Sequence, residues 1–127
     1  MTGRNSKDLK VLLVEDFEDT RLFMRLELEE LGFIVFEAEN GQVAVETATR
    51  EQPDVILMDL TLPLMDGFEA TKLIRQNEAL KNVPVIAVTA HQEDDFRSDA
   101  KASGFDAYVT KPIDVNWLKE LIAGLLI

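Results

Sequence analysis

Short apolar runs alternate along this chain with longer segments in which apolar residues recur every three or four positions. The runs are rich in Val and Ile and occupy residues 11–14, 33–36, 55–58, 85–88 and, more weakly, 107–109. Brief apolar runs of this composition predict β-strands that are buried on both faces. The longer segments have the periodicity of amphipathic helices.

The longer segments predict five helices, one after each strand. The first ends at Gly32, a stop signal. Asn40 and Asp114 can cap the second and the fifth, because their side chains accept hydrogen bonds from free backbone N–H groups. The third and fourth are expected at about residues 67–78 and 92–103, and the fourth is mostly polar.

Strict alternation of strands and helices predicts an α/β fold with a parallel sheet and helices on both faces. A sheet of five strands suits the flavodoxin-like order 2-1-3-4-5, in which strands 1 and 3 are neighbours at the switch point. The length of 127 residues fits one domain. We therefore expect a short polar leader at residues 1–8 and a single domain at 9–127.

Polar residues follow four of the predicted strands. They are Glu15 and Asp16 after the first, Asp59 after the third, Thr89 after the fourth, and Thr110 and Lys111 after the fifth. Ligands of open α/β sheets bind outside the carboxyl ends of the strands. One polar residue at a strand end has little meaning, because any strand must end in something polar. Three acids, the Thr89 hydroxyl and a lysine at one edge indicate a site.

Crowded carboxylates repel one another and need a cation. The chain has no cysteine and one histidine, His91, so the available ligands are oxygen atoms. Oxygen ligands suit Mg²⁺, Mn²⁺ or Ca²⁺, and Mg²⁺ in particular leaves room for water and phosphate. A lysine and a threonine opposite the metal are what a bound phosphoryl group would use.

Composition excludes several classes of protein. The 13 basic and 24 acidic residues give a net charge of −11, which disfavours direct binding to nucleic acid or anionic membranes, although the acidity could also serve solubility alone. The apolar runs are far shorter than the ~20 residues that span a bilayer. The N-terminus lacks a signal peptide, so we expect a cytoplasmic protein. The glycine-rich motifs of nucleotide-binding proteins, G-x-G-x-x-G and G-x-x-x-x-G-K-[ST], are both missing from the sequence, which disfavours a nucleotide enzyme.

Motifs at the strand ends resemble those of the response-regulator receiver domains, the CheY-like proteins of two-component signalling. The matching segments are VED at residues 14–16, MDLTLPLMDG at 58–67, VTA at 88–90 and VTKP at 109–112. The resemblance extends over residues 9–126, nearly the whole chain. It implies a domain that accepts a phosphoryl group from the phosphohistidine of a histidine kinase or a histidine phosphotransfer protein.

The resemblance also implies roles for individual residues. Asp59 is similar to the phosphoacceptor. Asp16, Asp59 and the backbone carbonyl of Thr61 would bind Mg²⁺, with Mn²⁺ as a substitute. Glu15 would hold a metal-bound water, at a position where the family often has Asp. The phosphoryl oxygens would be bound by Thr89 and Lys111.

Further residues resemble the family's switch. Tyr108 matches its aromatic switch residue, which would respond with Thr89, although an aromatic packed on the core would have the same pattern. Thr61 and His91 match positions that modulate the lifetime of the phosphorylated state, and His91 could also be an inert rim residue. The output surface would be helix four, strand 5 and helix five, which would bind a downstream protein or a second copy. Trp117 is interpreted as surface packing on helix five.

Two other classes of protein compete with this interpretation. Aspartate-nucleophile phosphatases resemble a D-x-D pattern, but Thr61 stands where the second acid would be. Phosphorylation-independent binding modules on this fold usually lose an acid or the lysine, and here both kinds of residue are present. The sequence leaves open the cognate kinase, the pathway, the downstream target, the oligomeric state, the lifetime of the phosphorylated state and whether this is a stand-alone protein.

Overall fold

The computed structural model describes residues 9–60, 67–89, 104–111 and 113–126. Their elements, in chain order, are β1 (Lys10–Val14), α1 (Glu18–Glu30), β2 (Ile34–Ala38), α2 (Gly41–Glu51), β3 (Val55–Asp59), α3 (Gly67–Gln76), the 3₁₀ helix η2 (Glu78–Leu80), β4 (Val85–Thr89), β5 (Ala107–Thr110) and α5 (Val115–Leu125). The helix expected at residues 92–103 lies outside the described residues, as do Thr61 and His91.

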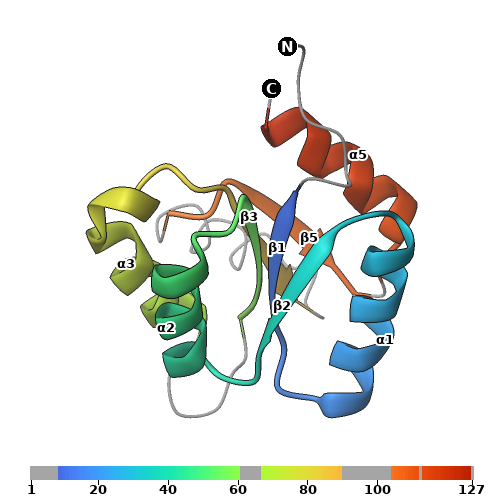
Figure 1. Ribbon diagram of the computed structural model, residues 1–127, viewed down its shortest axis with the longest axis horizontal. Coiled ribbons are helices and arrows are strands. Elements are labelled where there is room, and N and C mark those ends of the chain that lie inside the picture. The colour runs from blue at the N-terminus through green and yellow to red at the C-terminus, as the bar shows by residue number, and fades with distance from the viewer. Residues whose placement is uncertain (1–8, 61–66, 90–103, 112, 127) are drawn as a thin grey trace.

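The strands form one parallel sheet in the order β2-β1-β3-β4-β5, as the alternating pattern predicts (Figure 1). β1 pairs with β2 on one side and with β3 on the other, and Val14 is opposite Met58 in the second pair. The chain adds β2 on one side of β1 and β3 on the other, so the switch point of the sheet lies between β1 and β3. Their carboxyl ends flank the crevice where such sheets bind ligands.

Helices cover both faces of the sheet, which confirms the expected layers (Figure 1). On one face, Ala44 of α2 and Ile74 of α3 pack against the sheet in one buried cluster. On the other face, Leu28 of α1 and Leu118 of α5 belong to a second cluster. The two clusters are separated by the sheet, because alternate residues of each strand point to opposite faces. No helix among the described residues is long and apolar enough to cross a bilayer.

The prediction that every strand is buried on both faces is right for β3 and β4 and nearly so for β1, and wrong for β2 and β5. The last two are the edge strands, and one side of an edge strand has no neighbour to cover it. Ile34 of β2 remains 46% exposed. This strand also begins one residue later than expected and extends to Ala38.

The predicted helix signals are confirmed where the structure describes them. Asn40 accepts a hydrogen bond from the N–H of Val43 at 2.9 Å. Asp114 caps α5 in the same way. Gly32 has a φ of 101°, a left-handed conformation that favours glycine and ends a helix. α3 ends at Gln76, two residues earlier than expected, and η2 follows.

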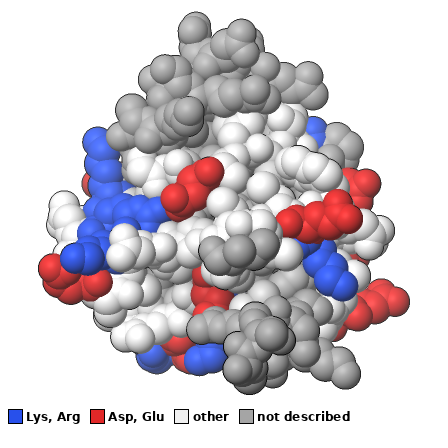
Figure 2. Space-filling view, turned by 90° about the horizontal axis from the view of Figure 1, so that it is seen from above, with Lys and Arg blue, Asp and Glu red and all other residues white. Residues whose placement is uncertain are grey.

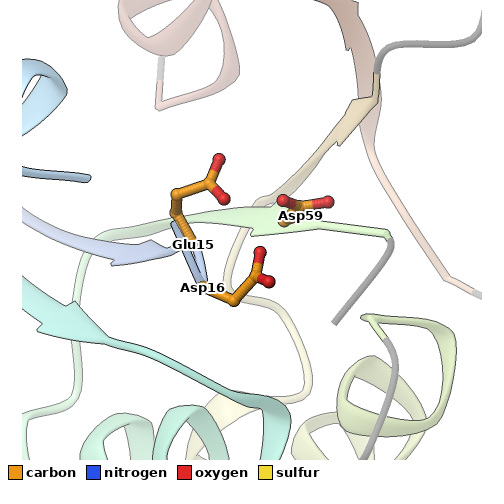
Figure 3. Close-up of side chains that lie close together, drawn as sticks. All are labelled: Glu15, Asp16 and Asp59. Atoms are coloured by element: carbon orange, nitrogen blue, oxygen red, sulfur yellow. The ribbon is translucent and has the colours of Figure 1, made fainter. Parts of the chain in front are cut away.

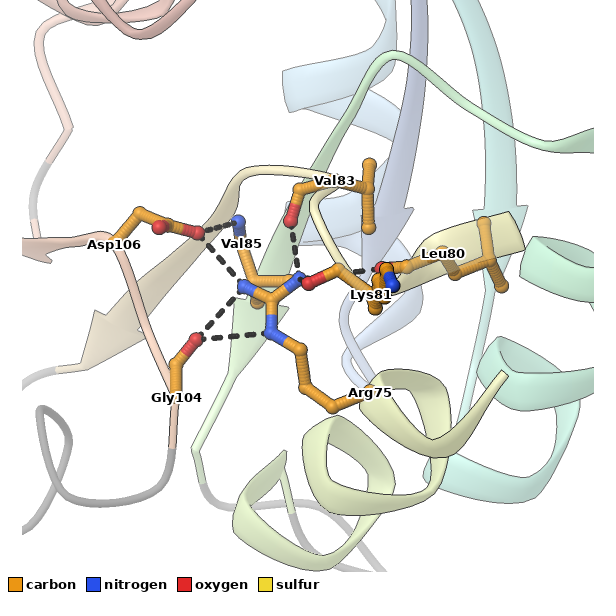
Figure 4. Close-up of polar contacts among 7 residues, drawn as sticks. All are labelled: Arg75, Leu80, Lys81, Val83, Val85, Gly104 and Asp106. Atoms are coloured by element: carbon orange, nitrogen blue, oxygen red, sulfur yellow. Dashed lines mark hydrogen bonds and ion pairs between the residues drawn. The ribbon is translucent and has the colours of Figure 1, made fainter. Parts of the chain in front are cut away.

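Arg75, on the last turn of α3, binds the segments that lead into β4 and β5 (Figure 4). Its guanidinium donates to the carbonyl of Gly104 at 2.8 Å and to the carboxylate of Asp106 at 2.8 Å. It also donates to the carbonyls of three residues that precede β4, which are Leu80, Lys81 and Val83. A planar group with five donors can satisfy several acceptors at once. Arg75 thus ties α3 to the amino ends of two strands.

Seen from the top of Figure 1, where the strands begin, acidic and basic side chains are interspersed among uncharged ones on the described surface (Figure 2). The acidity of the chain is therefore not gathered on that part of this face. The acids that do gather lie at the opposite, carboxyl ends of the strands.

Gly67, the first residue of α3, allows this helix to begin against the end of β3. A Cβ atom on Gly67 would clash with the carbonyl oxygen of Asp59 and would lie 3.0 Å from the Cα of Leu60. The obstacle is backbone, which cannot turn aside as a flexible side chain can. Gly124 in α5 is different, because a Cβ there would meet nothing within 4 Å.

We expect Gly67→Ala to reduce the free energy of unfolding by about 1–3 kcal/mol, because the added methyl group forces the backbone apart. Gly124→Ala should instead be neutral or stabilising by up to about 1 kcal/mol, since alanine favours helix. Urea unfolding of the two variants measures both values. Equal stability of Gly67→Ala and the wild type would contradict the close approach.

Candidate functional site

Three carboxylates meet at the ends of two neighbouring strands (Figure 3). Glu15 and Asp16 follow β1, and Asp59 is the last residue of β3. The N–H of Glu15 donates to the carbonyl of Ala38 at 3.0 Å, so the chain continues the pairing with β2 just beyond β1. Each of the three acids offers a carboxylate oxygen within 4.8 Å of the others.

The three acids differ in exposure. Glu15 is 4% exposed and Asp59 is 6% exposed, whereas Asp16 is open to solvent. Burial of charged groups is costly unless they are paired. Two of the acids therefore need a positive partner, and the third can meet an ion that arrives from solution.

Lys111 supplies a positive charge from the other side of the site. Its N–H donates to the carbonyl of Thr89 at 2.7 Å just after β5. Its Nζ lies 2.7 Å from Oε1 of Glu15 and 3.3 Å from Oδ2 of Asp59. Lys111 thus bridges the two buried acids, and the pair with Glu15 is the shorter.

Burial alone would lower the pKa of the Lys111 ammonium. The hydrogen bond to Glu15, the charges of Asp59 and Glu15 and the hydrogen bond to Asp59 outweigh burial and raise this pKa above its ordinary value. The side chain is therefore positively charged at neutral pH. A charged ammonium group is a suitable partner for an anion such as a phosphoryl group.

The charges of the site fit a divalent cation. Three carboxylates and one ammonium group leave an excess of two negative charges. The donors are all carboxylate oxygens, which are the ligands that Mg²⁺ and Mn²⁺ prefer. Asp16 and Asp59 would hold the ion directly, because both oxygens of Glu15 have partners in Lys111 and the N–H of Phe17.

The other predicted residues are placed as follows. Thr89 is the last residue of β4 and is 2% exposed, and Asp59 is opposite Val88, so Thr89 lies at the same edge as the acids. Tyr108 of β5 is half-buried and packs against the core cluster on the side of α2 and α3, and its role in a switch stays a prediction. Trp117 is 49% exposed on α5, as expected.

One contact at the site was missed in the sequence. Arg21 of α1 donates to the backbone carbonyl of Glu15 at 2.9 Å. A possible signal was that Arg21 and Arg25 are spaced by one helical turn in a helix with many acids. Such a pattern usually means a solvated face with ion pairs along the helix, and it does not indicate contact with a backbone carbonyl.

Comparison with known proteins decides the family. A family model described as the response regulator receiver domain matches residues 11–123. The chain belongs to the response-regulator receiver family. The fold and the order of the strands are those of a receiver domain of two-component signalling.

Individual relatives are similar over almost their whole length. This receiver domain is 36% identical to the polar-differentiation response regulator DivK of Brucella anthropi, over 91% of this chain and 94% of that protein. It superimposes on the chemotaxis protein CheY4 of Vibrio cholerae with a TM-score of 0.88 at 29% identity, which covers 93% of this chain and 98% of the other.

A third relative bears on the metal. The receiver domain of a sensor histidine kinase from Pseudomonas aeruginosa is 34% identical, with a TM-score of 0.87 over 93% of this chain and 97% of the other. In that structure a magnesium ion is coordinated in the active site cleft. The acidic cluster of the present receiver domain is compatible with such binding.

We expect Asp16→Asn to weaken Mg²⁺ binding about tenfold, equivalent to about 1.4 kcal/mol, because it neutralises the acid that is open to an incoming ion. Glu15→Gln should weaken it less, because Glu15 is engaged by Lys111 and Phe17. Without metal, Asp16→Asn should also be at least as stable as the wild type, since one repulsion is removed. An NMR titration with MgCl₂ measures the affinities, and unchanged affinity in both variants would disprove the metal site.

Proposed function

We propose that Asp59 accepts a phosphoryl group from a phosphohistidine in a reaction that depends on Mg²⁺. The observation that carries the proposal is the position of Asp59, a buried carboxylate between two other acids and the Lys111 ammonium. A buried carboxylate with an ammonium on one side and a place for a divalent cation on the other is arranged to bind one more anionic group.

In the transfer, an oxygen of Asp59 attacks phosphorus in line with the bond to the imidazole nitrogen of the donor. That P–N bond breaks, its electron pair stays on the imidazole, and an acyl phosphate forms on Asp59. Mg²⁺, held by Asp16, Asp59 and the carbonyl of Thr61, would neutralise charge on the phosphoryl oxygens. Lys111 would move from Glu15 to a phosphoryl oxygen, and Thr89 would donate to another. Phosphoryl transfer needs this positioning and charge neutralisation more than covalent machinery.

Two rival functions are less well supported. Membership of the receiver family weighs against an aspartate-nucleophile phosphatase. A binding module that works without phosphorylation would not need Lys111 and the three acids together in one place. We infer that the protein is a signalling domain that catalyses its own phosphorylation and dephosphorylation, and that it carries one phosphoryl group per cycle.

We expect incubation with Mg²⁺ and acetyl phosphate to add one phosphoryl group to the wild type, visible as a mass shift that hydroxylamine removes. Asp59→Asn should abolish this labelling, because the amide cannot form an acyl phosphate. Asp19→Asn removes an exposed acid of α1 and serves as the matched control, which should be labelled like the wild type. Labelling of Asp59→Asn at the wild-type level would disprove the assignment.

The protein that delivers the phosphoryl group needs a surface beside the site, and the surface of α1 offers one. Phe23 is 65% exposed, and Phe17, just before the helix, is 60% exposed. Large apolar side chains exposed beside a charged site indicate a surface for a partner. A cleft of about 390 Å³ is lined by Phe23, Met24 and three polar side chains of α1, by Ile113 and by Lys111 of the site itself. We infer that the histidine kinase or phosphotransfer protein docks here.

We expect Phe23→Ser to slow transfer from a phosphorylated donor protein about tenfold, because losing one apolar anchor costs about 1.4 kcal/mol or more. The donor is the kinase or phosphotransfer protein that phosphorylates the wild type fastest in a screen. Labelling by acetyl phosphate should be unchanged, because it needs no docking. Ile34→Ser, at the exposed start of β2, is the control that should keep both rates. Normal transfer to Phe23→Ser would place the docking surface elsewhere.

The switch proposed for this domain runs from Thr89 to Tyr108 and on to helix four, β5 and α5. A phosphoryl group adds a charge of about −1.5 to −2, which would attract the Thr89 hydroxyl and favour a packing in which Tyr108 moves. The surface so changed would bind a downstream protein or a second copy. Hydrogen exchange measured with and without Mg²⁺ and beryllofluoride tests this switch. Changes in protection that are confined to residues near Asp59, with helix four and Tyr108 unaffected, would contradict it.

Helix four, Thr61 and His91 lie outside the described residues, so their roles stay predictions. Substituting both Thr61 and His91 should change the rate at which the acyl phosphate hydrolyses and leave the phosphorylation of Asp59 largely intact. An unchanged hydrolysis rate would count against their role. The polar leader at residues 1–8 and the cytoplasmic location also stay predictions.

A further inference from the structure

Arg21 of α1 connects the loop that carries two metal-site acids to the neighbouring strand β2. Its Nη1 donates to the carbonyl of Glu15 at 2.9 Å, and its Nε lies 3.4 Å from Oε1 of Glu37. The side chain is only 17% exposed. A guanidinium held by a carboxylate on one side is a rigid support for the carbonyl on its other side.

The carbonyl that Arg21 binds belongs to the peptide bond between Glu15 and Asp16. The orientation of that peptide plane sets the directions in which both side chains leave the backbone. The N–H of Arg21 also donates to the carbonyl of Phe17 at 2.9 Å, and the N–H of Phe17 donates to Oε2 of Glu15 at 3.1 Å. The loop is therefore held by its own hydrogen bonds and by the side chain of Arg21.

The positive charge of Arg21 opposes the binding of Mg²⁺ nearby, because like charges repel. Its contact with the backbone acts in the other direction, since it holds the two acids in place. We propose that Arg21 is a positioning residue for the phosphoryl-transfer site, and that it orients the Glu15–Asp16 peptide so that Asp16 faces Asp59 across the metal position. This inference rests on the proposed Mg²⁺ site.

Arg25 provides a matched control one helical turn later. It carries the same charge and pairs with the same carboxylate, at 3.1 Å from Oε2 of Glu37. Its second ion pair is with Glu29, at 3.9 Å within α1. Arg21 and Arg25 thus share one anchor, and the contact with the Glu15 carbonyl distinguishes Arg21.

The test compares the Mg²⁺ affinity of Arg21→Met and Arg25→Met, measured by NMR titration on protein shown by urea unfolding to be folded. Loss of a positive charge alone would make both variants bind Mg²⁺ as tightly as the wild type or more tightly. Loss of positioning should make Arg21→Met bind about tenfold more weakly than Arg25→Met. Arg21→Lys keeps the charge but has a single nitrogen for two acceptors, so it should bind Mg²⁺ between the wild type and Arg21→Met.

The outcomes separate this inference from the proposed function. Binding by Arg21→Met and Arg21→Lys as tight as that of Arg25→Met would overturn the positioning role and leave the metal site intact. Absence of Mg²⁺ binding by the wild type would overturn the metal site and this inference together. If Arg21→Met does not fold, Arg21→Lys decides the matter alone, because weaker binding without a change of charge can come only from lost positioning.

Discussion

The mutual repulsion of Glu15, Asp16 and Asp59 is the constraint on which the site depends. Three carboxylates can share one place only if cations hold them, and Lys111 supplies a single positive charge. Two of these acids are buried, so the imbalance cannot be relieved by water alone. The charges of the site therefore suit a further cation, and in the proposed function this makes the arrival of a phosphoryl group depend on Mg²⁺.

The rest of the fold holds these charges in register. Apolar clusters on both faces of the sheet hold β1 and β3 side by side, and the close approach at Gly67 lets α3 begin directly over the end of β3. At the other end of the sheet, Arg75 ties α3 to the segments before β4 and β5. Arg21 supports the loop after β1 in a similar way, through a backbone carbonyl. In both cases a guanidinium connects a helix to backbone carbonyls of loops beside the sheet.

Local signals in the sequence predicted much of this. The apolar runs placed the strands, the caps at Asn40 and Asp114 placed helix ends, and the polar residues after the strands placed the site, because each depends on neighbours in the chain. The exposure of the edge strands was missed although the predicted strand order put them at the edges, because the apolar composition of a run does not show how much of it is covered. The partner of Lys111 could not be predicted either: Glu15 is 96 residues away, and the choice between two acids depends on side-chain geometry. Arg21 was missed because an arginine in an acidic helix has the pattern of a surface ion pair.

The central claim is that Asp59, Lys111 and the acids after β1 form one phosphoryl and metal site. The most direct test is a crystal structure of the protein with Mg²⁺ and beryllofluoride, which imitates the phosphoryl group. The account predicts beryllium bonded to a carboxylate oxygen of Asp59, Mg²⁺ in contact with Asp16 and Asp59, and the Lys111 ammonium moved from Glu15 to a fluorine atom. Beryllofluoride bound elsewhere, or a Lys111 that still bridges Glu15 and Asp59 with the site occupied, would contradict it.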